Sequence, residues 1–164
     1  MKSIVLIVHN LRSCHNAGSL LRTAEGLGVQ MVFLTGYTPY PQTPDDTRMP
    51  HIAAKLHRQI TKTALGAEAS QAWRHADTIE EVLQVLRSQG FTIAAIEQAE
   101  NSIRLPDFKP PEKIALVVGR EVEGIEPEVV ALCDQVLEIP MFGKKESFNV
   151  VQAAAMALYH SRFG

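Results

Sequence analysis

The sequence predicts an α/β domain, with a mostly parallel sheet and helices on both of its faces. Two observations predict this class. Apolar runs of strand length recur along the chain without polar alternation, and segments with helical periodicity lie between them. Unalternating runs suit strands that are covered on both faces, as the strands of parallel sheets are. Strands of this kind alternating with helices are typical of a layered α/β fold.

Five segments have the length and the apolar character of buried strands. They comprise residues 3–8, 32–35, 91–96, 114–118 and 136–139. Leucine and alanine side chains between positions 20 and 27 recur at helical spacing, and Gly28 follows as a C′ glycine. A second helix is predicted to begin after Thr78, which has Glu81 three residues later in the spacing of a capping box, and to close at Gly90.

The last predicted helix, residues 149–161, is apolar on nearly every face. Gln152 is almost its only polar residue before His160. Such a helix must be buried all round. Because the chain is small, a homodimer is expected to supply part of that cover. Complete burial within one chain is the alternative.

Length and composition indicate one globular domain over residues 1–164, with 46% apolar and 21% charged residues. No apolar run reaches the roughly 18 to 20 residues that span a bilayer, and the first residues lead into a strand without a cleavage site. We therefore expect a cytoplasmic protein with no membrane partner. Cys14 and Cys133 are predicted to be free thiols. The six histidines lack metal-ligand spacing, so no metal site is predicted.

A proline-rich segment and a basic segment follow the second predicted strand. Residues 36–50 carry four prolines and are predicted to form a long exposed loop. Residues 47–67 contain no acidic residue, although the net charge of the chain is −2. This local basic patch is either a nucleic-acid contact or a solvated surface without a partner. Its basic side chains are Arg48, His51, Lys55, His57, Arg58 and Lys62.

A glycine-bounded segment, Gly119 to Gly124, directly follows the fourth predicted strand. It predicts a tight turn at the carboxyl end of a parallel strand, where ligands bind in open sheets. The segment is not a phosphate-binding Walker A loop, because Ile125 and Glu126 stand where lysine and serine or threonine are required. Turn formation without a ligand is the alternative.

Two further segments carry polar side chains at the start of helices. Asn16 and Arg22 lie roughly on one helical face near a helix start, where an anion such as phosphate can bind. Alternatively, Asn16 caps the helix and Arg22 forms a surface ion pair. In residues 139–149, Ser147 and Asn149 can cap the last helix, and the adjacent pair of lysines suits a phosphate.

Taken together, in this order and spacing, the three segments resemble the signature motifs of TrmH-like (SpoU) methyltransferases of the SPOUT superfamily. The resemblance covers essentially the whole chain. It rests on His9-Asn10 to Val29 with Asn16-Ala-Gly-Ser-Leu-Leu-Arg22-Thr-Ala, on Leu116-Val-Val-Gly119-Arg-Glu121-Val-Glu-Gly124 and on Ile139-Pro-Met141 to Ser147-Phe-Asn149-Val150. It implies a deep C-terminal trefoil knot, a feature that general topology rules would exclude.

The resemblance also implies an activity, namely transfer of a methyl group from S-adenosylmethionine to a ribose 2′-hydroxyl of RNA by a homodimer. The residues it assigns to catalysis are Arg22, Asn16, Glu121, Ser147 and Asn149. Those it assigns to the cofactor are Ile96, Glu97, Val118, Gly119, Arg120, Glu121, Gly124, Ile139, Met141, Ser147 and Asn149. The basic side chains expected to contact RNA phosphates are Arg48, Arg58, Lys62, Lys144 and Lys145.

Two departures from the family pattern bear on activity. Phe148 and Val151 stand where the family usually has leucine and serine. An RNA-binding member that has lost methyl transfer is therefore the first alternative, and a SPOUT enzyme that methylates a base nitrogen is the second. No separate RNA-binding extension is expected, so substrate choice is expected to depend on the core, on a loop over residues 36–61 and on the dimer surface. The short length favours tRNA over rRNA.

Overall fold

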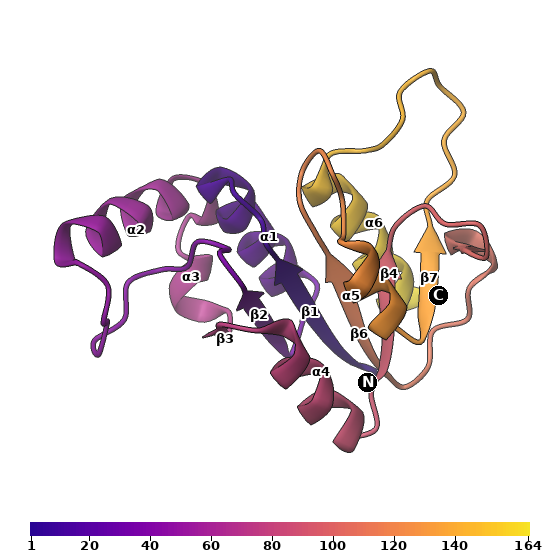
Figure 1. Cartoon of the computed structure of the whole chain (residues 1–164), viewed down its shortest axis with the longest axis horizontal. Helices are drawn as coiled ribbons and strands as arrows, with labels where there is room; N and C mark the ends of the chain where they lie inside the picture. Colours follow the sequence, from indigo (N-terminus) through magenta and orange to yellow (C-terminus); the bar gives the residue numbers. More distant parts are fainter.

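A parallel sheet of seven strands, in the order β3-β2-β1-β6-β4-β7-β5, forms the centre of the molecule (Figure 1). The structure is a computed structural model that describes residues 1–164. Every pair of neighbouring strands is parallel, which confirms the predicted sheet. The strands are β1 (Ser3–His9), β2 (Met31–Thr35), β3 (Trp73–Ala76), β4 (Thr92–Ile96), β5 (Ile103–Arg104), β6 (Lys113–Val118) and β7 (Gln135–Glu138).

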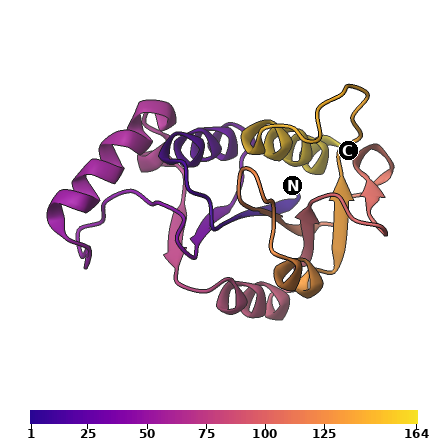
Figure 2. The ribbon, with the colours of Figure 1, turned by 45° about the horizontal axis from the view of Figure 1, so that its top comes forward.

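Helices cover both faces of the sheet, as predicted (Figure 2). Helices α1, α2 and α6 lie on one side, while α4 and α5 lie on the other. None of the helices combines the length and the apolar character needed to cross a bilayer. The helices are α1 (Cys14–Gly26), α2 (Pro50–Ala64), α3 (Ala67–Ser70), α4 (Ile79–Ser88), α5 (Pro127–Leu132) and α6 (Val150–Phe163), with one 3₁₀ turn, η1 (Leu105–Asp107).

Strand β1 shows why the run from Ile4 to Val8 is apolar at every position. Ile4, Leu6 and Val8 pack in the core that includes side chains of α1 and α6, whereas Val5 and Ile7 pack on the opposite face with α4 and α5. All five side chains are buried. Each contributes roughly 1.5 to 3 kcal/mol relative to an exposed position. A strand that is covered on both faces has no position at which a polar residue would be tolerated.

The five predicted strands lie within one residue of their expected limits. The edge strands β3 and β5 were not predicted, because β3 carries an exposed Arg74 and β5 is only 2 residues long. Gly28 and Gly90 end their helices with positive φ angles, as predicted. The capping box was wrong, since Thr78 occupies the N-cap position of α4 but its side chain makes no capping hydrogen bond. The trefoil knot stays a prediction.

The substrate loop expected over residues 36–61 is shorter than predicted, because helix α2 begins at Pro50. Proline is favoured at the first helical position, where its missing N–H leaves no hydrogen bond unmade. Helix α2 packs closely on α1 at Gly18, where a Cβ atom would lie 2.2 Å from the Ile60 carbonyl oxygen. The basic segment is therefore mostly a helix that is held against the core.

Helix α6 is only partly covered within one chain. Ala154, Ala157 and Leu158 are fully buried, but Tyr159 is 60% exposed and Phe163 is 67% exposed. The alternative of complete burial within one chain is therefore wrong. An apolar face of this helix remains open to solvent.

Arg162, near the end of α6, joins three distant segments of backbone. Its guanidinium donates to the carbonyl oxygens of Lys2 at 2.6 Å, Leu27 at 3.1 Å and Gly28 at 2.7 Å. The last two follow helix α1, whose C-terminal end carries partial negative charge. One cation thus fixes the ends of β1, α1 and α6 relative to one another.

We expect Arg162→Ala to lower the free energy of unfolding by about 2 kcal/mol, the size of hydrogen bonds that involve a charged group. Urea denaturation of both proteins measures the difference. Arg74→Ala is the matched control, because Arg74 is exposed on an edge strand. Equal losses in the two variants would show that the three carbonyl contacts do not stabilise the fold.

Candidate functional site

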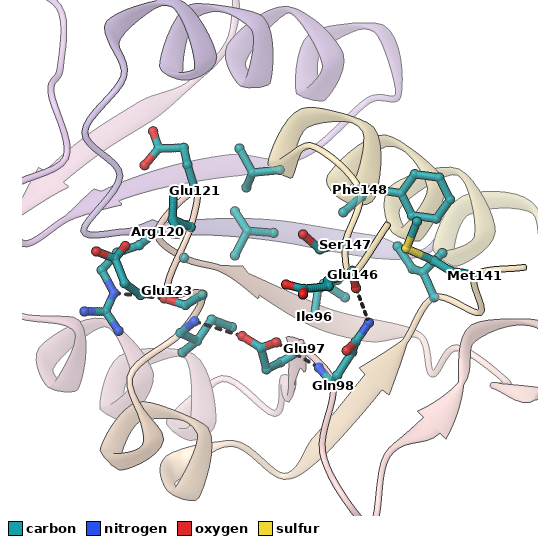
Figure 3. Close-up of a pocket in the computed structure, with 18 residues that line it drawn as sticks. Ile96, Glu97, Gln98, Arg120, Glu121, Glu123, Met141, Glu146, Ser147 and Phe148 are labelled. Carbon is teal, nitrogen blue, oxygen red and sulfur yellow. Dashed lines mark hydrogen bonds between the residues drawn. The ribbon is translucent and has the colours of Figure 1, made fainter. Parts of the chain in front are cut away.

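A cavity of about 260 Å³ lies at the carboxyl ends of β4, β6 and β7 (Figure 3). Three segments surround it: the end of β4 at residues 96–98, the turn after β6 at residues 118–125, and the loop from β7 to α6. This position is the usual ligand site of a parallel sheet. Its lining residues are Ile96, Glu97, Gln98, Val118, Gly119, Arg120, Glu121, Val122, Glu123, Gly124, Ile125, Ile139, Met141, Glu146, Ser147, Phe148, Val150 and Ala153.

The structure brings together all but one of the residues that the resemblance assigned to the cofactor. The exception is Asn149, which is the N-cap of α6 and accepts a hydrogen bond of 2.8 Å from the Val151 backbone N–H. Ser147 lines the cavity and makes no capping bond. Of the two capping residues foreseen for this helix, only Asn149 therefore acts as one.

The turn after β6 is closed by its own backbone. The amides of Arg120 and Gly124 each donate to the carbonyl of the other at 3.2 Å, and the Arg120 Nε–H also donates to the Gly124 oxygen at 3.0 Å. The Val122 side chain at the tip of the turn is exposed. The turn is thus a rigid element that extends beside the cavity.

Glu121, in this turn, binds the N-terminus of α1. Its carboxylate accepts the Ser13 N–H at 2.8 Å and the Arg12 N–H at 3.3 Å. Burial alone would raise the pKa of Glu121, but these hydrogen bonds, with one from its own amide and a contribution from Asn16, hold the pKa below its ordinary value. Ser13 is the N-cap of α1, so the alternative that Asn16 caps this helix is wrong.

A second polar cluster lies behind the turn and was not predicted. Glu126 accepts a hydrogen bond of 2.9 Å from Asn10 and lies 3.5 Å from Arg120 Nε and 3.6 Å from His9 Nε2. Burial lowers the pKa of His9, against the opposing charge of Glu126. The other His9 nitrogen is 2.8 Å from the Thr35 hydroxyl. The signal that could have found this cluster is the position of His9 and Asn10, at the carboxyl end of β1 and at the start of the first family motif.

The chemistry of the cavity wall suits a ligand with a flat apolar ring and a positive charge. Apolar side chains such as Ile96, Ile139 and Met141 form about half of the lining, and four glutamates border it. Arg120 is the only basic residue in the wall, and it lies beside Glu126. No group of three or more histidine, cysteine, aspartate or glutamate side chains is arranged to hold a metal ion.

Comparison with known proteins decides the family. The sequence model of the SpoU rRNA Methylase family matches residues 3–159. The chain belongs to the SpoU rRNA methylase family. It is 26% identical to the tRNA (guanosine(18)-2'-O)-methyltransferase of Aquifex aeolicus, over 98% of the chain and 69% of that protein.

The name of a second SpoU relative specifies a different RNA. The chain is 30% identical to the 23S rRNA (guanosine-2'-O-)-methyltransferase RlmB of Neisseria meningitidis serogroup B, over 97% of the chain. It spans 58% of the length of that relative. Among solved structures, the AdoMet-bound rRNA methyltransferase of Sinorhizobium meliloti superposes with a TM-score of 0.81 at 20% identity, over 99% of the chain and 57% of that protein. This likeness confirms the fold.

The two departures from the SpoU pattern, Phe148 and Val151, have different surroundings. Phe148 lines the cavity, and Val151 is partly buried against the core that α6 shares with the sheet. A phenylalanine in the wall is compatible with a flat apolar ligand. Val151 donates its backbone N–H to the Asn149 cap, a contact that does not depend on its side chain.

Arg22 lies apart from the cavity within one chain. It is exposed on α1, two turns beyond the first-turn residue Asn16, and neither residue lines the cavity. Asn16 is linked to it through Glu121, whose pKa it helps to lower. Of the predicted catalytic residues, Asn16 and Glu121 thus meet at the start of α1 and Arg22 lies farther along that helix, whereas Ser147 and Asn149 lie at the start of α6.

Four of the five predicted phosphate contacts are exposed, and the fifth is not free. Arg58 and Lys62 lie on α2, and Lys144 and Lys145 lie on the loop beside the cavity. Arg48 instead pairs with Asp46 at 2.6 Å, donates to the Tyr40 and Pro41 carbonyls, and stacks on the Tyr40 ring. Its guanidinium holds the proline-rich loop together, and its contact with RNA stays a prediction.

Glu121→Gln should weaken the fold by about 1 kcal/mol at pH 7, because a neutral amide interacts less with a helix N-terminus. The pKa of Glu121 is lowered on folding, so its stabilisation is present above the unfolded value of 4.5 and is lost as pH falls through the folded value. The difference between variant and parent should therefore shrink below about pH 4.5 in urea titrations. Glu100→Gln, at an exposed position, is the control. A difference that is independent of pH would contradict the assignment.

Proposed function

We propose that this protein transfers a methyl group from S-adenosylmethionine to a ribose 2′-hydroxyl of RNA. The observation that carries the proposal is the single cavity where residues of the second and third family motifs meet, with Glu121 linking it to the first motif. The two curated relatives are named as ribose 2′-O-methyltransferases, and the Sinorhizobium structure is named as AdoMet-bound. These names support the reaction and the cofactor.

The residues of the cavity fit S-adenosylmethionine. The apolar side chains Ile96, Ile139 and Met141 would contact the adenine ring, and the close approach of backbone at Gly119 leaves no room for a side chain there. The carboxylates on the wall favour a cationic sulfonium over a neutral ligand. When bound, S-adenosylmethionine would supply a methyl group on a positively charged sulfur, and in an in-line displacement the carbon–sulfur bond breaks as the ribose oxygen bonds to the methyl carbon, so that the sulfur leaves as a neutral thioether.

The residues of the chain have to position the ribose oxygen, and the hydroxyl proton has to be removed. Alignment at about 3 to 3.5 Å from the methyl carbon provides most of the acceleration in such a reaction. Arg22 is proposed to orient the RNA phosphate and ribose and to stabilise the developing oxyanion. Its guanidinium is a poor base, because the pKa of arginine lies above about 12. Asn16, Glu121, Ser147 and Asn149 are proposed to shape the surroundings.

A homodimer is the form in which we propose that the site works. Arg22 does not line the cavity of its own chain, so a second copy or the RNA has to bring it to the methyl group. The open face of α6, with Tyr159 and Phe163, has the apolar character of a subunit interface. Sedimentation equilibrium measures the mass of the assembly, and a monomer at micromolar concentration would contradict the proposal.

RNA is proposed to lie along a row of basic side chains on α2. His51, Lys55, Arg58 and Lys62 are all exposed, and their spacing of four, three and four residues places them on one helical face. Burial raises the pKa of Cys14, which lies in the first turn of α1, and the positive charge of Lys55 acts in the opposite direction. The row therefore passes close to the helix start where Glu121 binds. Lys144 and Lys145 are further exposed cations, on the loop that borders the cavity.

tRNA is the proposed substrate, with rRNA as the competing one. The names of the two relatives include both RNA classes, and the tRNA relative is matched over the larger share of its length, 69% against 58%. An RNA-binding protein without methyl transfer is the second candidate, and Phe148 and Val151 are the residues that favour it.

With methyl-tritiated S-adenosylmethionine, unmodified tRNA should become labelled at one position that resists alkaline cleavage. Arg22→Lys should reduce the rate about 100-fold, because lysine lacks the planar fork of donors. Arg74→Lys is the matched control at an exposed site. Near-full turnover of Arg22→Lys would contradict the role of Arg22. Cofactor binding without label on tRNA or rRNA would favour the RNA-binding candidate.

RNA affinity should fall steeply as salt rises, with a slope that reflects the number of phosphate contacts. Lys62→Ala should reduce the slope by about one and weaken binding to all RNA sequences alike. Lys109→Ala, at an exposed position away from α2, should leave both unchanged. Fluorescence anisotropy between about 50 and 200 mM salt measures the slope. Binding that is indifferent to salt would contradict the basic row.

A further inference from the structure

The end of β4 places two polar side chains, Glu97 and Gln98, between the other two segments of the cavity wall (Figure 3). One side chain bonds to the turn after β6, and the other bonds to the loop between β7 and α6. The turn after β6 and the loop before α6 are thus each hydrogen-bonded to one of two adjacent residues at the end of β4.

The carboxylate of Glu97 lies directly against the turn. Its Oε2 accepts the Ile125 N–H at 3.0 Å, and its Oε1 accepts the Gln98 N–H at 2.9 Å. Gly124 has a φ of +72°, and a Cβ atom there would lie 2.2 Å from Glu97 Oε2. Backbone donors therefore occupy both oxygens, and only glycine permits this approach.

The amide of Gln98 makes the only hydrogen bond between residues 140–147 and another part of the chain. Its Nε2 donates to the Glu146 carbonyl oxygen at 2.8 Å. Residues 142–147 are all exposed, and the loop projects from the body of the molecule (Figure 1). Met141 and Ser147, near its two ends, line the cavity. The position of residues 140–147 thus depends on this one hydrogen bond to the rest of the chain.

We propose that Glu97 and Gln98 are positioning residues, which hold the turn 119–124 and the loop 139–149 at the separation that the methyl donor requires. The inference rests on the proposed function, because the ligand is taken to be S-adenosylmethionine. It alters the role foreseen for Glu97, whose carboxylate holds the wall in place through the backbone of Ile125. A preformed wall spares the ligand the cost of ordering the loop.

Three variants of similar side-chain size test the proposal: Gln98→Met, Glu97→Met and, as the control on the same loop, Glu100→Met. Glu100 is exposed and makes no side-chain hydrogen bond. By calorimetry, Gln98→Met should bind S-adenosylmethionine about three- to tenfold more weakly, the range of one hydrogen bond, and Glu97→Met at least as weakly. The KM for the methyl donor should rise while the KM for RNA stays unchanged.

Trypsin provides a readout that does not involve the ligand, because Lys144 and Lys145 lie on the tied loop. Cleavage there should be faster in Gln98→Met than in the parent or in Glu100→Met, with equal unfolding temperatures. Unchanged cleavage and affinity in Gln98→Met would overturn the proposal. A parent protein that binds no S-adenosylmethionine would refute the proposed function. The positioning role proposed for that ligand would then be refuted as well, even if the cleavage rates showed that Gln98 holds the loop.

Discussion

Burial of a parallel sheet on both faces is the constraint on which the rest of this structure depends. Strands such as β1 and β6 present apolar side chains in both directions, so polar chemistry is excluded from the body of the sheet. It is confined to the segments that follow the strands. Because all strands are parallel, these segments emerge at one edge, and the order β1-β6-β4-β7 places four of them side by side.

These segments do not form a site merely by being neighbours, since hydrogen bonds of polar side chains join them to one another. Glu121 reaches from the turn after β6 to the start of α1, and Asn10 reaches from β1 to Glu126. Glu97 and Gln98 reach from β4 to the two remaining walls. Bonds of this kind fix loop positions without closing the cavity, because the side chains lie along its wall. The arrangement is typical of a site that holds its shape before the ligand binds.

The two halves of the surface differ in charge in a way that matches the proposed reaction. The cavity is bordered by glutamates, which suit a cationic methyl donor, whereas α2 presents exposed basic side chains that suit RNA phosphates. The chain is slightly acidic overall, so net charge alone concealed the basic row. Helix α6 adds a third kind of surface, an apolar face that one chain leaves open.

The sequence by itself determined the five central strands, three of the six α-helices and the residues around the cavity. Apolar runs and end glycines such as Gly28 are local signals, and the family motifs carry Gly119, Glu121 and Ser147 in recognisable order. Only the tertiary structure decided which of these residues meet. Ser13 and Glu121 are 108 residues apart, and their contact depends on the strand order, which no local pattern encodes. The same reason explains why the ion pair of Arg48 with Asp46 and the hydrogen bond of Gln98 to Glu146 could not be predicted: whether a polar side chain has a partner depends on the segment that folding brings beside it.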